Sequence, residues 1–137
     1  MWVVRKGAVV AEGSASTHDD APDLRAPPVS GTRRENGAVV VSLAGELDLY
    51  NANDVREALL ACVGEEPERL VVDLADVRFI DSTALGVLIE ARSRLADKRA
   101  FLLAAPGLET RRALEISGLD RHFTVCATVD EALAASL

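Results

Sequence analysis

The chain has 137 residues, of which 49% are hydrophobic and 27% are charged, a balance that predicts one globular domain with its own core. Its formal net charge is -7 at pH 7, so its electrostatic field repels phosphate backbones and anionic lipid surfaces. We therefore predict that the protein does not bind nucleic acid.

The first 28 residues differ in composition from the rest of the chain. Residues 11–28 are small, polar and rich in proline, and they show neither the helical nor the strand period of apolar residues. We predict a flexible N-terminal extension over residues 1–28 and a folded domain over residues 29–137. Met1 to Val10 is either a short strand or a translated leader, and the sequence does not decide between them. Because it has no long apolar core, we expect no signal peptide, no membrane insertion and a cytoplasmic location.

From Val29 onward, strand patterns alternate with helix patterns. Asn36-Gly37 separates two extended runs, which is typical of a β-hairpin. A helix with Asn51 or Asn53 as its cap follows the second run. The later predicted elements are a strand from Arg69 whose tail is Arg78 to Ile80, a helix at Ser82–Leu95, a strand at Ala100–Ala105, a helix at Leu108–Ser117 before Gly118, a strand at Phe123–Ala127 and a final helix opened by Thr128 and Glu131.

This alternation predicts an α/β fold. Strands separated by helices pair in parallel through right-handed crossovers, so we expect a mixed sheet with a hairpin at one side. If the strand at Ala38–Gly45 and the strand at Leu70–Leu74 are parallel neighbours, their C-terminal ends share one edge of the sheet. Asp48 would then lie near Asp81 and Ser82.

Three hydrogen-bonding residues, Asp81, Ser82 and Thr83, stand where a strand meets a helix. Each residue type caps helices, but one cap is enough. Such corners also bind anions or present a hydroxyl to a partner. The carboxylates of Glu46 and Asp48 are either solvated residues at a strand end or part of an acidic, hydroxyl-bearing patch for a protein partner, and they are too few for a metal site.

Sequence motifs for other chemistry are absent. The chain has no phosphate-binding loop, no GxGxxG after a strand and no HExxH. Ser82 stands in "DSTAL" rather than GxSxG, and neither His18 nor His122 is an obvious base for it, which disfavours a serine hydrolase. Cys62 and Cys126 lie in apolar runs without metal-ligand spacing, so buried, reduced thiols are expected and no metal.

Three stretches carry a resemblance to a known family. They are "VSLAGELDLYNANDVREAL", "RLVVDLADVRFIDSTALGVLIEA" and "RALEISGLDRHFTVCATVDEAL". In this order and at these separations they resemble the STAS domains of bacterial anti-sigma factor antagonists, over roughly Val29 to Leu137. The most specific piece is "IDSTALGVL", which is similar to the family's motif around its phosphorylated serine, although Ala84 stands where a glycine is usual. The resemblance implies a single STAS-like domain with helices packed mainly on one face of the sheet.

The resemblance also implies a partner-switching function. The unphosphorylated antagonist binds an anti-sigma factor that is also a serine/threonine kinase, and this binding frees a sigma factor for transcription. Phosphorylation of the serine by that kinase breaks the complex, and a PP2C-type phosphatase restores it. Carried onto this sequence, Ser82 is the phosphorylated residue. The implied partner-binding residues are Asp48, Asp81, Ser82, Thr83, Ala84, Leu85 and Gly86, and the loop after Asp48 belongs to the same docking surface.

Three interpretations remain, of which the antagonist is favoured. The second is a STAS subunit of a stressosome-type or transporter-associated complex, and the third is the serine hydrolase. The first implies a protein that is not an enzyme and has no cofactor of its own, since ATP and Mg²⁺ belong to the kinase. A phosphoserine at position 82 would add about -1.5 to -2 charges at a helix N-terminus, where the dipole favours them, so the fold should survive.

Overall fold

The computed structural model describes residues 25–137, so the strand considered for Met1 to Val10 lies outside the described residues. The elements in chain order are β1 (Val29–Glu35), β2 (Ala38–Leu47), α1 (Ala52–Gly64), β3 (Arg69–Ile80), α2 (Ser82–Arg94), the short 3-10 helix η1 (Lys98–Ala100), β4 (Phe101–Ala104), α3 (Leu108–Ser117), β5 (Thr124–Cys126) and α4 (Val129–Ala134). The expected alternation of strands and helices is confirmed.

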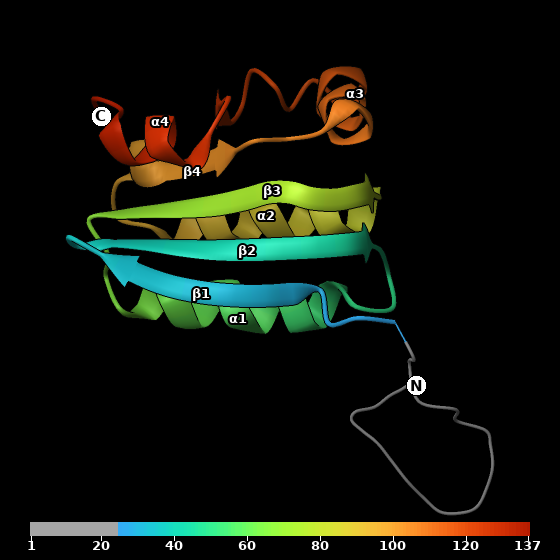
Figure 1. Ribbon diagram of the computed structural model, residues 1–137, viewed down its shortest axis with the longest axis horizontal. Helices are drawn as coiled ribbons and strands as arrows, with labels where there is room; N and C mark the ends of the chain where they lie inside the picture. The colour runs from blue at the N-terminus through green and yellow to red at the C-terminus, as the bar shows by residue number, and fades with distance from the viewer. Residues whose placement is uncertain (1–24) are drawn as a thin grey trace, which may run out of the picture.

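The five strands form one sheet in the order β1-β2-β3-β4-β5. β1 and β2 are antiparallel, and every other neighbouring pair is parallel. The hairpin turn consists of Asn36, with φ 51°, and Gly37, with φ 84°, the left-handed conformations that a tight hairpin turn requires. The predicted mixed sheet with a hairpin at one side is therefore confirmed (Figure 1).

Helices cover the two faces of the sheet unequally, as Figure 1 shows. The larger apolar cluster joins inward side chains of the strands to Leu59 of α1, Leu88 of α2 and Leu114 of α3. The smaller cluster lies on the other face, where Ala132 of α4 packs with Val40 and neighbouring strand residues. The expected packing of helices mainly on one face is confirmed, with α4 as the helix on the opposite face.

The two cysteines belong to the apolar interior. Cys62 is buried in the larger cluster, and Cys126 is half-buried against the smaller one. Both thiols are free, and burial raises the pKa of each. The predicted burial is therefore confirmed for Cys62 and is only partial for Cys126.

The second half of β3 positions the candidate site. β4 pairs with β3 only as far as Asp73, whereas β2 stays paired with β3 to the end of that strand. The register between β2 and β3 shifts twice along this stretch, as it does at β-bulges. Leu47 consequently pairs with Ile80, so that Asp48 and Asp81 each follow the paired ends directly. Parallel pairing thus brings these two carboxylates to one edge, as predicted.

Residues 25–28 belong to the predicted N-terminal extension, yet they run beside the domain. The carbonyl of Pro28 accepts a hydrogen bond from the backbone N–H of Ala44, at 2.9 Å. The domain boundary at residue 28 stays a prediction.

Candidate functional site

At the corner between β3 and α2, one side chain caps the helix and the two that follow it are exposed to solvent. Asp81 is the N-cap of α2, and its Oδ1 accepts a hydrogen bond from the N–H of Ala84 at 3.0 Å. Ser82 and Thr83 are the first two residues of the helix, and both are exposed. Neither hydroxyl forms a hydrogen bond with any of residues 25–137. One carboxylate therefore caps the helix, and both hydroxyls remain available to another molecule.

The residues after Thr83 divide between the core and the surface. Ala84 is 1% exposed and Leu85 is 6% exposed, because both side chains point into the larger cluster. Gly86 is exposed, and a Cβ added there would meet nothing within 4 Å. Ala84 and Leu85, which the family resemblance implied as partner-binding residues, therefore position the corner instead of forming its surface. The absent side chain of Gly86 leaves the turn above Ser82 open.

The loop between β2 and α1 is held in shape by its own side chains. Asp48 Oδ1 accepts a hydrogen bond from the N–H of Tyr50 at 3.0 Å. The amide of Asn51 bridges the loop, since its Oδ1 accepts from the N–H of Asp48 at 3.0 Å and its Nδ2 donates to the carbonyl of Glu46 at 2.8 Å. Asn51 occupies the N-cap position of α1 without a side-chain cap hydrogen bond, and Asn53 lies inside the helix. Asn51, one of the two predicted cap residues, is therefore the N-cap of α1, but its side chain fixes the loop and does not cap the helix.

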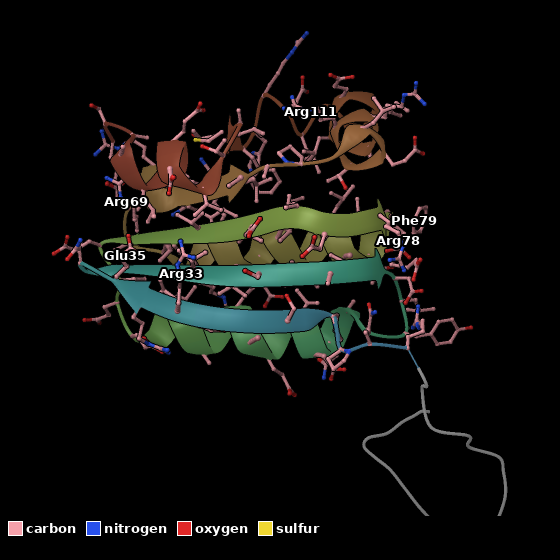
Figure 2. The ribbon with its side chains drawn as sticks, in the orientation of Figure 1. Arg33, Glu35, Arg69, Arg78, Phe79 and Arg111 are labelled. Carbon is pink, nitrogen blue, oxygen red and sulfur yellow. The ribbon has the colours of Figure 1, made fainter. Side chains whose placement is uncertain are left out.

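Large apolar side chains surround the corner and are exposed to solvent. We call this region the Ser82 edge: residues 48–51, 79–86 and 105–108, which follow or end β2, β3 and β4. Leu49 is 66% exposed, Tyr50 83%, Phe79 49% and Leu108 63%. Figure 2 shows Phe79 at the C-terminal end of β3, next to Arg78. Leu49 and Tyr50 lie in the loop after Asp48, which the family resemblance implied as part of the docking surface. Phe79 and Leu108 were not predicted from the sequence, and their apolar side chains close to polar residues at strand ends were the available signal.

Two ion pairs lie at or next to the Ser82 edge. Arg78 pairs with Glu46, with its NH2 atom 2.9 Å from Glu46 Oε2, and Arg25 pairs with Asp48, with its NH1 atom 2.8 Å from Asp48 Oδ2. Within residues 25–137, no group of three or more metal-ligating side chains comes together. The carboxylates of this edge therefore interact with arginines and backbone N–H groups.

The only histidine among the described residues lies far from Ser82 in the topology. His122 precedes β5, whose N-terminal end lies at the opposite edge of the sheet, and its ring packs edge-on against Phe123 with centroids 5.1 Å apart. His18 lies outside the described residues. The geometry gives Ser82 no histidine base from residues 25–137, which removes the structural support for the hydrolase interpretation.

Comparisons with known proteins agree with this geometry. The profile of the STAS domain family matches residues 31–132. The anti-sigma-F factor antagonist RsfB of Mycobacterium tuberculosis is 36% identical over 98 residues, which is 72% of this chain and 80% of that protein. The anti-sigma-B factor antagonist of Bacillus subtilis is 33% identical over 89 residues, 64% of this chain and 80% of that protein.

A solved structure supports the same relationship. The crystal structure of an anti-sigma factor antagonist from Mycobacterium paratuberculosis has a TM-score of 0.71 and 35% identity, covering 75% of this chain and 88% of that chain. Among residues 25–137, no helix is both long and apolar enough to cross a membrane. On its sequence match and its fold, the chain belongs to the STAS-domain family of anti-sigma factor antagonists.

Proposed function

We propose that this protein is an anti-sigma factor antagonist that is switched by phosphorylation of Ser82. In its unphosphorylated form, the Ser82 edge binds an anti-sigma factor that is also a serine/threonine kinase, and the sigma factor is released. The observation that carries the proposal is the exposed Ser82 hydroxyl on the first turn of α2, left unused because Asp81 caps the helix. A PP2C-type phosphatase would return the protein to its binding form in the cytoplasm.

The surroundings of Ser82 suit docking of a protein partner. Leu49, Tyr50 and Phe79 supply exposed apolar surface, and the Asx-type hydrogen bond within residues 48–50 fixes the loop before binding. Aromatic side chains on preorganised loops contribute strongly to protein interfaces, because little conformational freedom is lost on binding. Thr83 and Gly86 extend the exposed surface along α2.

Phosphorylation at this position would change binding without changing the fold. A phosphate on Ser82 faces the N-terminal dipole of α2, so the helix tolerates it. A docked partner would instead bury a doubly charged group close to the carboxylates of Asp48 and Asp81. Leaving such a charge unpaired in an interface costs several kcal/mol, which lowers affinity by orders of magnitude. The switch therefore needs no rearrangement inside the domain.

The same proposal assigns no catalysis and no cofactor to this chain. The kinase would supply ATP and Mg²⁺, and the antagonist would supply only the serine. The stressosome-type or transporter-associated complex stays an alternative prediction, because both assemblies would use the same domain. Identification of the bound partner separates these interpretations.

The test is affinity capture from the native lysate with mass spectrometry. Wild type, Ser82→Ala and Ser82→Asp serve as baits, with Ser93→Asp as the matched control, because Ser93 is an exposed serine on the last turns of the same helix. We expect wild type, Ser82→Ala and Ser93→Asp to capture a kinase-like anti-sigma factor, and Ser82→Asp to lose it. Circular dichroism checks that each bait is folded.

The stricter measurement uses the captured kinase itself. Incubation with ATP should place phosphate on Ser82 in wild type and none on Ser82→Ala, and calorimetry should show much weaker binding of the phosphorylated protein. Phosphate on Thr83 in place of Ser82, or equal affinity of both forms, would contradict the proposal. Recovery of a transporter or of a stressosome-type assembly in place of an anti-sigma factor would favour the alternative.

A further inference from the structure

The segment that precedes β1 reaches the Ser82 edge. Arg25 contacts both carboxylate oxygens of Asp48, with NH1 2.8 Å from Oδ2 and NH2 3.5 Å from Oδ1. Three residues later, Pro28 is hydrogen-bonded to Ala44 of β2. In Figure 1, the short stretch before β1 lies at the end of the sheet where β2 finishes. Arg25, the first described residue, therefore lies beside the loop of residues 48–51.

The ion pair with Arg25 is not needed to shape that loop. Asp48 already accepts the N–H of Tyr50, and Asn51 already joins both sides of the loop. Arg25 instead forms an ion pair with the carboxylate of Asp48, and the Asp48 side chain is 22% exposed. A cationic side chain of a docking partner would compete with Arg25 for this carboxylate.

A hollow of about 500 Å³ opens from Arg25 across the sheet face toward β3. Its lining includes Ala44, Asp76 and Arg78. Leu49, Tyr50 and Phe79, which are exposed large apolar side chains, belong to the same end of the sheet. Together these residues form a surface that begins at Arg25, with exposed apolar side chains beside a hollow that holds both acidic and basic groups.

The start of the chain matches this surface in chemistry, and residues 1–24 are long enough to reach it. The chain opens with the apolar residues Trp2, Val3 and Val4, followed by the cations Arg5 and Lys6. The other charged residues before Arg25 are four carboxylates, so only the first six residues complement the surface. An extended chain covers up to about 3.3 to 3.6 Å per residue, so the stretch from Arg25 back to Trp2 is long enough to reach any part of the Ser82 edge. The apolar residues complement Leu49, Tyr50 and Phe79, and the cations complement Asp76.

We propose that residues 1–24 bind the Ser82 edge of their own chain, anchored by the Arg25–Asp48 ion pair, and compete there with the anti-sigma factor. The inference rests on the proposed function for the identity of the competitor, but the contact within the chain stands on its own. The apparent affinity for the partner is reduced by the fraction of molecules in which the edge is covered. Removing the anchor should therefore tighten binding.

The contact within the chain is tested without any partner, on the full-length protein. Amide shifts are compared by NMR between wild type and Trp2→Ala. We expect the amides of Leu49, Tyr50 and Phe79 to shift, and the amide of Gly37, at the opposite edge, to stay unchanged. Unchanged shifts at the three apolar residues would overturn the proposal, because Trp2 is too distant in sequence to affect them otherwise.

The competition is tested by calorimetry with the anti-sigma factor that the affinity capture identifies. Arg25→Ala should bind about two- to fivefold more tightly than wild type, the range expected when an exposed ion pair is removed. Arg33→Ala is the matched control, because Arg33 pairs with Glu35 on β1, away from the Ser82 edge, and should leave affinity unchanged. Equal or weaker binding of Arg25→Ala would overturn the competition. Failure to capture any anti-sigma factor would count against the proposed function, while the amide shifts would still decide the contact within the chain.

Discussion

The two ends of the sheet differ in whether their side chains pair within the chain or face solvent. One end is the Ser82 edge, at the C-terminal ends of the parallel strands. At the opposite end, which we call the hairpin edge and which holds residues 34–37, 64–69 and 95–100, polar groups form pairs within the chain. Arg34 binds Glu65 through two contacts, one of 2.8 Å from Nε to Oε1, and the N–H of Glu68 donates to the carbonyl of Gly37 at 2.9 Å. Asp97 caps η1. The Ser82 edge instead displays apolar side chains and two unbonded hydroxyls.

This contrast shows how one small domain separates stability from recognition. Exposed apolar surface does not stabilise a monomer, and a contiguous group of such side chains marks an interaction site. Of the seven large apolar side chains exposed among residues 25–137, Leu49, Tyr50, Phe79 and Leu108 lie at the Ser82 edge. The folding free energy comes from the two clusters between the edges.

The largest effect on stability is expected inside α2. Leu88 is 1% exposed, so Leu88→Ala should lower the free energy of unfolding by about 2 to 5 kcal/mol through lost burial and a residual cavity. Its neighbour Ile89 is 36% exposed, and Ile89→Ala should change the free energy of unfolding by less than about 1 kcal/mol. Urea denaturation measures both variants. Similar losses from the two substitutions would mean that α2 buries a different face.

Substitution of Tyr50 should affect partner binding strongly and stability only slightly. Because it is 83% exposed, Tyr50→Ser should change stability by less than about 0.5 kcal/mol, yet it should weaken binding of the anti-sigma factor about tenfold or more, as loss of an interface aromatic does. Ile116→Ser is the matched control, since Ile116 is 87% exposed on α3 outside the Ser82 edge. Calorimetry compares the two. Equal losses of affinity would show that the Ser82 edge is not the binding surface.

Local sequence patterns predicted the hairpin, the order of the strands and helices, and the position of Asp48 near Asp81. Asn36-Gly37 predicted the hairpin because few residues adopt two consecutive left-handed conformations, and alternating apolar patterns predicted the order of strands and helices. Parallel pairing then placed Asp48 near Asp81. These features depend on nearby residues, and so they are readable without a structure.

The finer details of the Ser82 edge depend on distant contacts. Asn51 is the N-cap residue of α1, but its amide binds Glu46 and Asp48 in place of the N–H groups of the helix. Ala84 and Leu85 stand next to Ser82 in sequence, and only the rotation of α2 against the sheet shows that they are buried. The Arg25–Asp48 pair joins residues 23 positions apart, and no local pattern predicts it.

The hairpin edge can be probed at Gly37, where φ is 84° and a Cβ would lie 2.7 Å from Glu68 Cδ. Gly37→Ala should lower the free energy of unfolding by about 1 to 2 kcal/mol, the usual penalty for a left-handed alanine. Gly45→Ala is the control, with the same φ and no atom within 4 Å of the added Cβ. Any excess loss at Gly37 should disappear in a Glu68→Ala background. An excess that persists there would mean that Glu68 does not pack on the turn.

The first turn of α3 holds the one buried side-chain polar atom without a hydrogen-bond partner among the described residues, Thr110 Oγ1. Thr110→Val removes this hydroxyl and keeps the shape, so stability should rise by about 1 kcal/mol. Thr128 provides the contrast, because its hydroxyl caps α4 by accepting the N–H of Glu131, and Thr128→Val should lose about 0.5 to 2 kcal/mol. Thermal unfolding compares the stability of the two variants with that of wild type. Destabilisation by Thr110→Val would show that its hydroxyl has a partner.

The smallest effect concerns the pH dependence of the hairpin edge. The hydrogen bond from Arg34 lowers the pKa of Glu65 below its ordinary value near 4.3, so the folded protein holds that proton less tightly than the unfolded chain. The stabilisation is therefore complete above the ordinary pKa and is lost as pH falls through the lowered one. An NMR titration of the Glu65 carboxyl should show the lowered pKa in wild type and an ordinary one in Arg34→Gln. Because the pair is exposed, 1 M salt should narrow the gap between the two proteins. A Glu65 pKa that does not respond to Arg34→Gln would mean that the ion pair does not persist in solution, and the hairpin edge would then depend on its backbone hydrogen bonds alone.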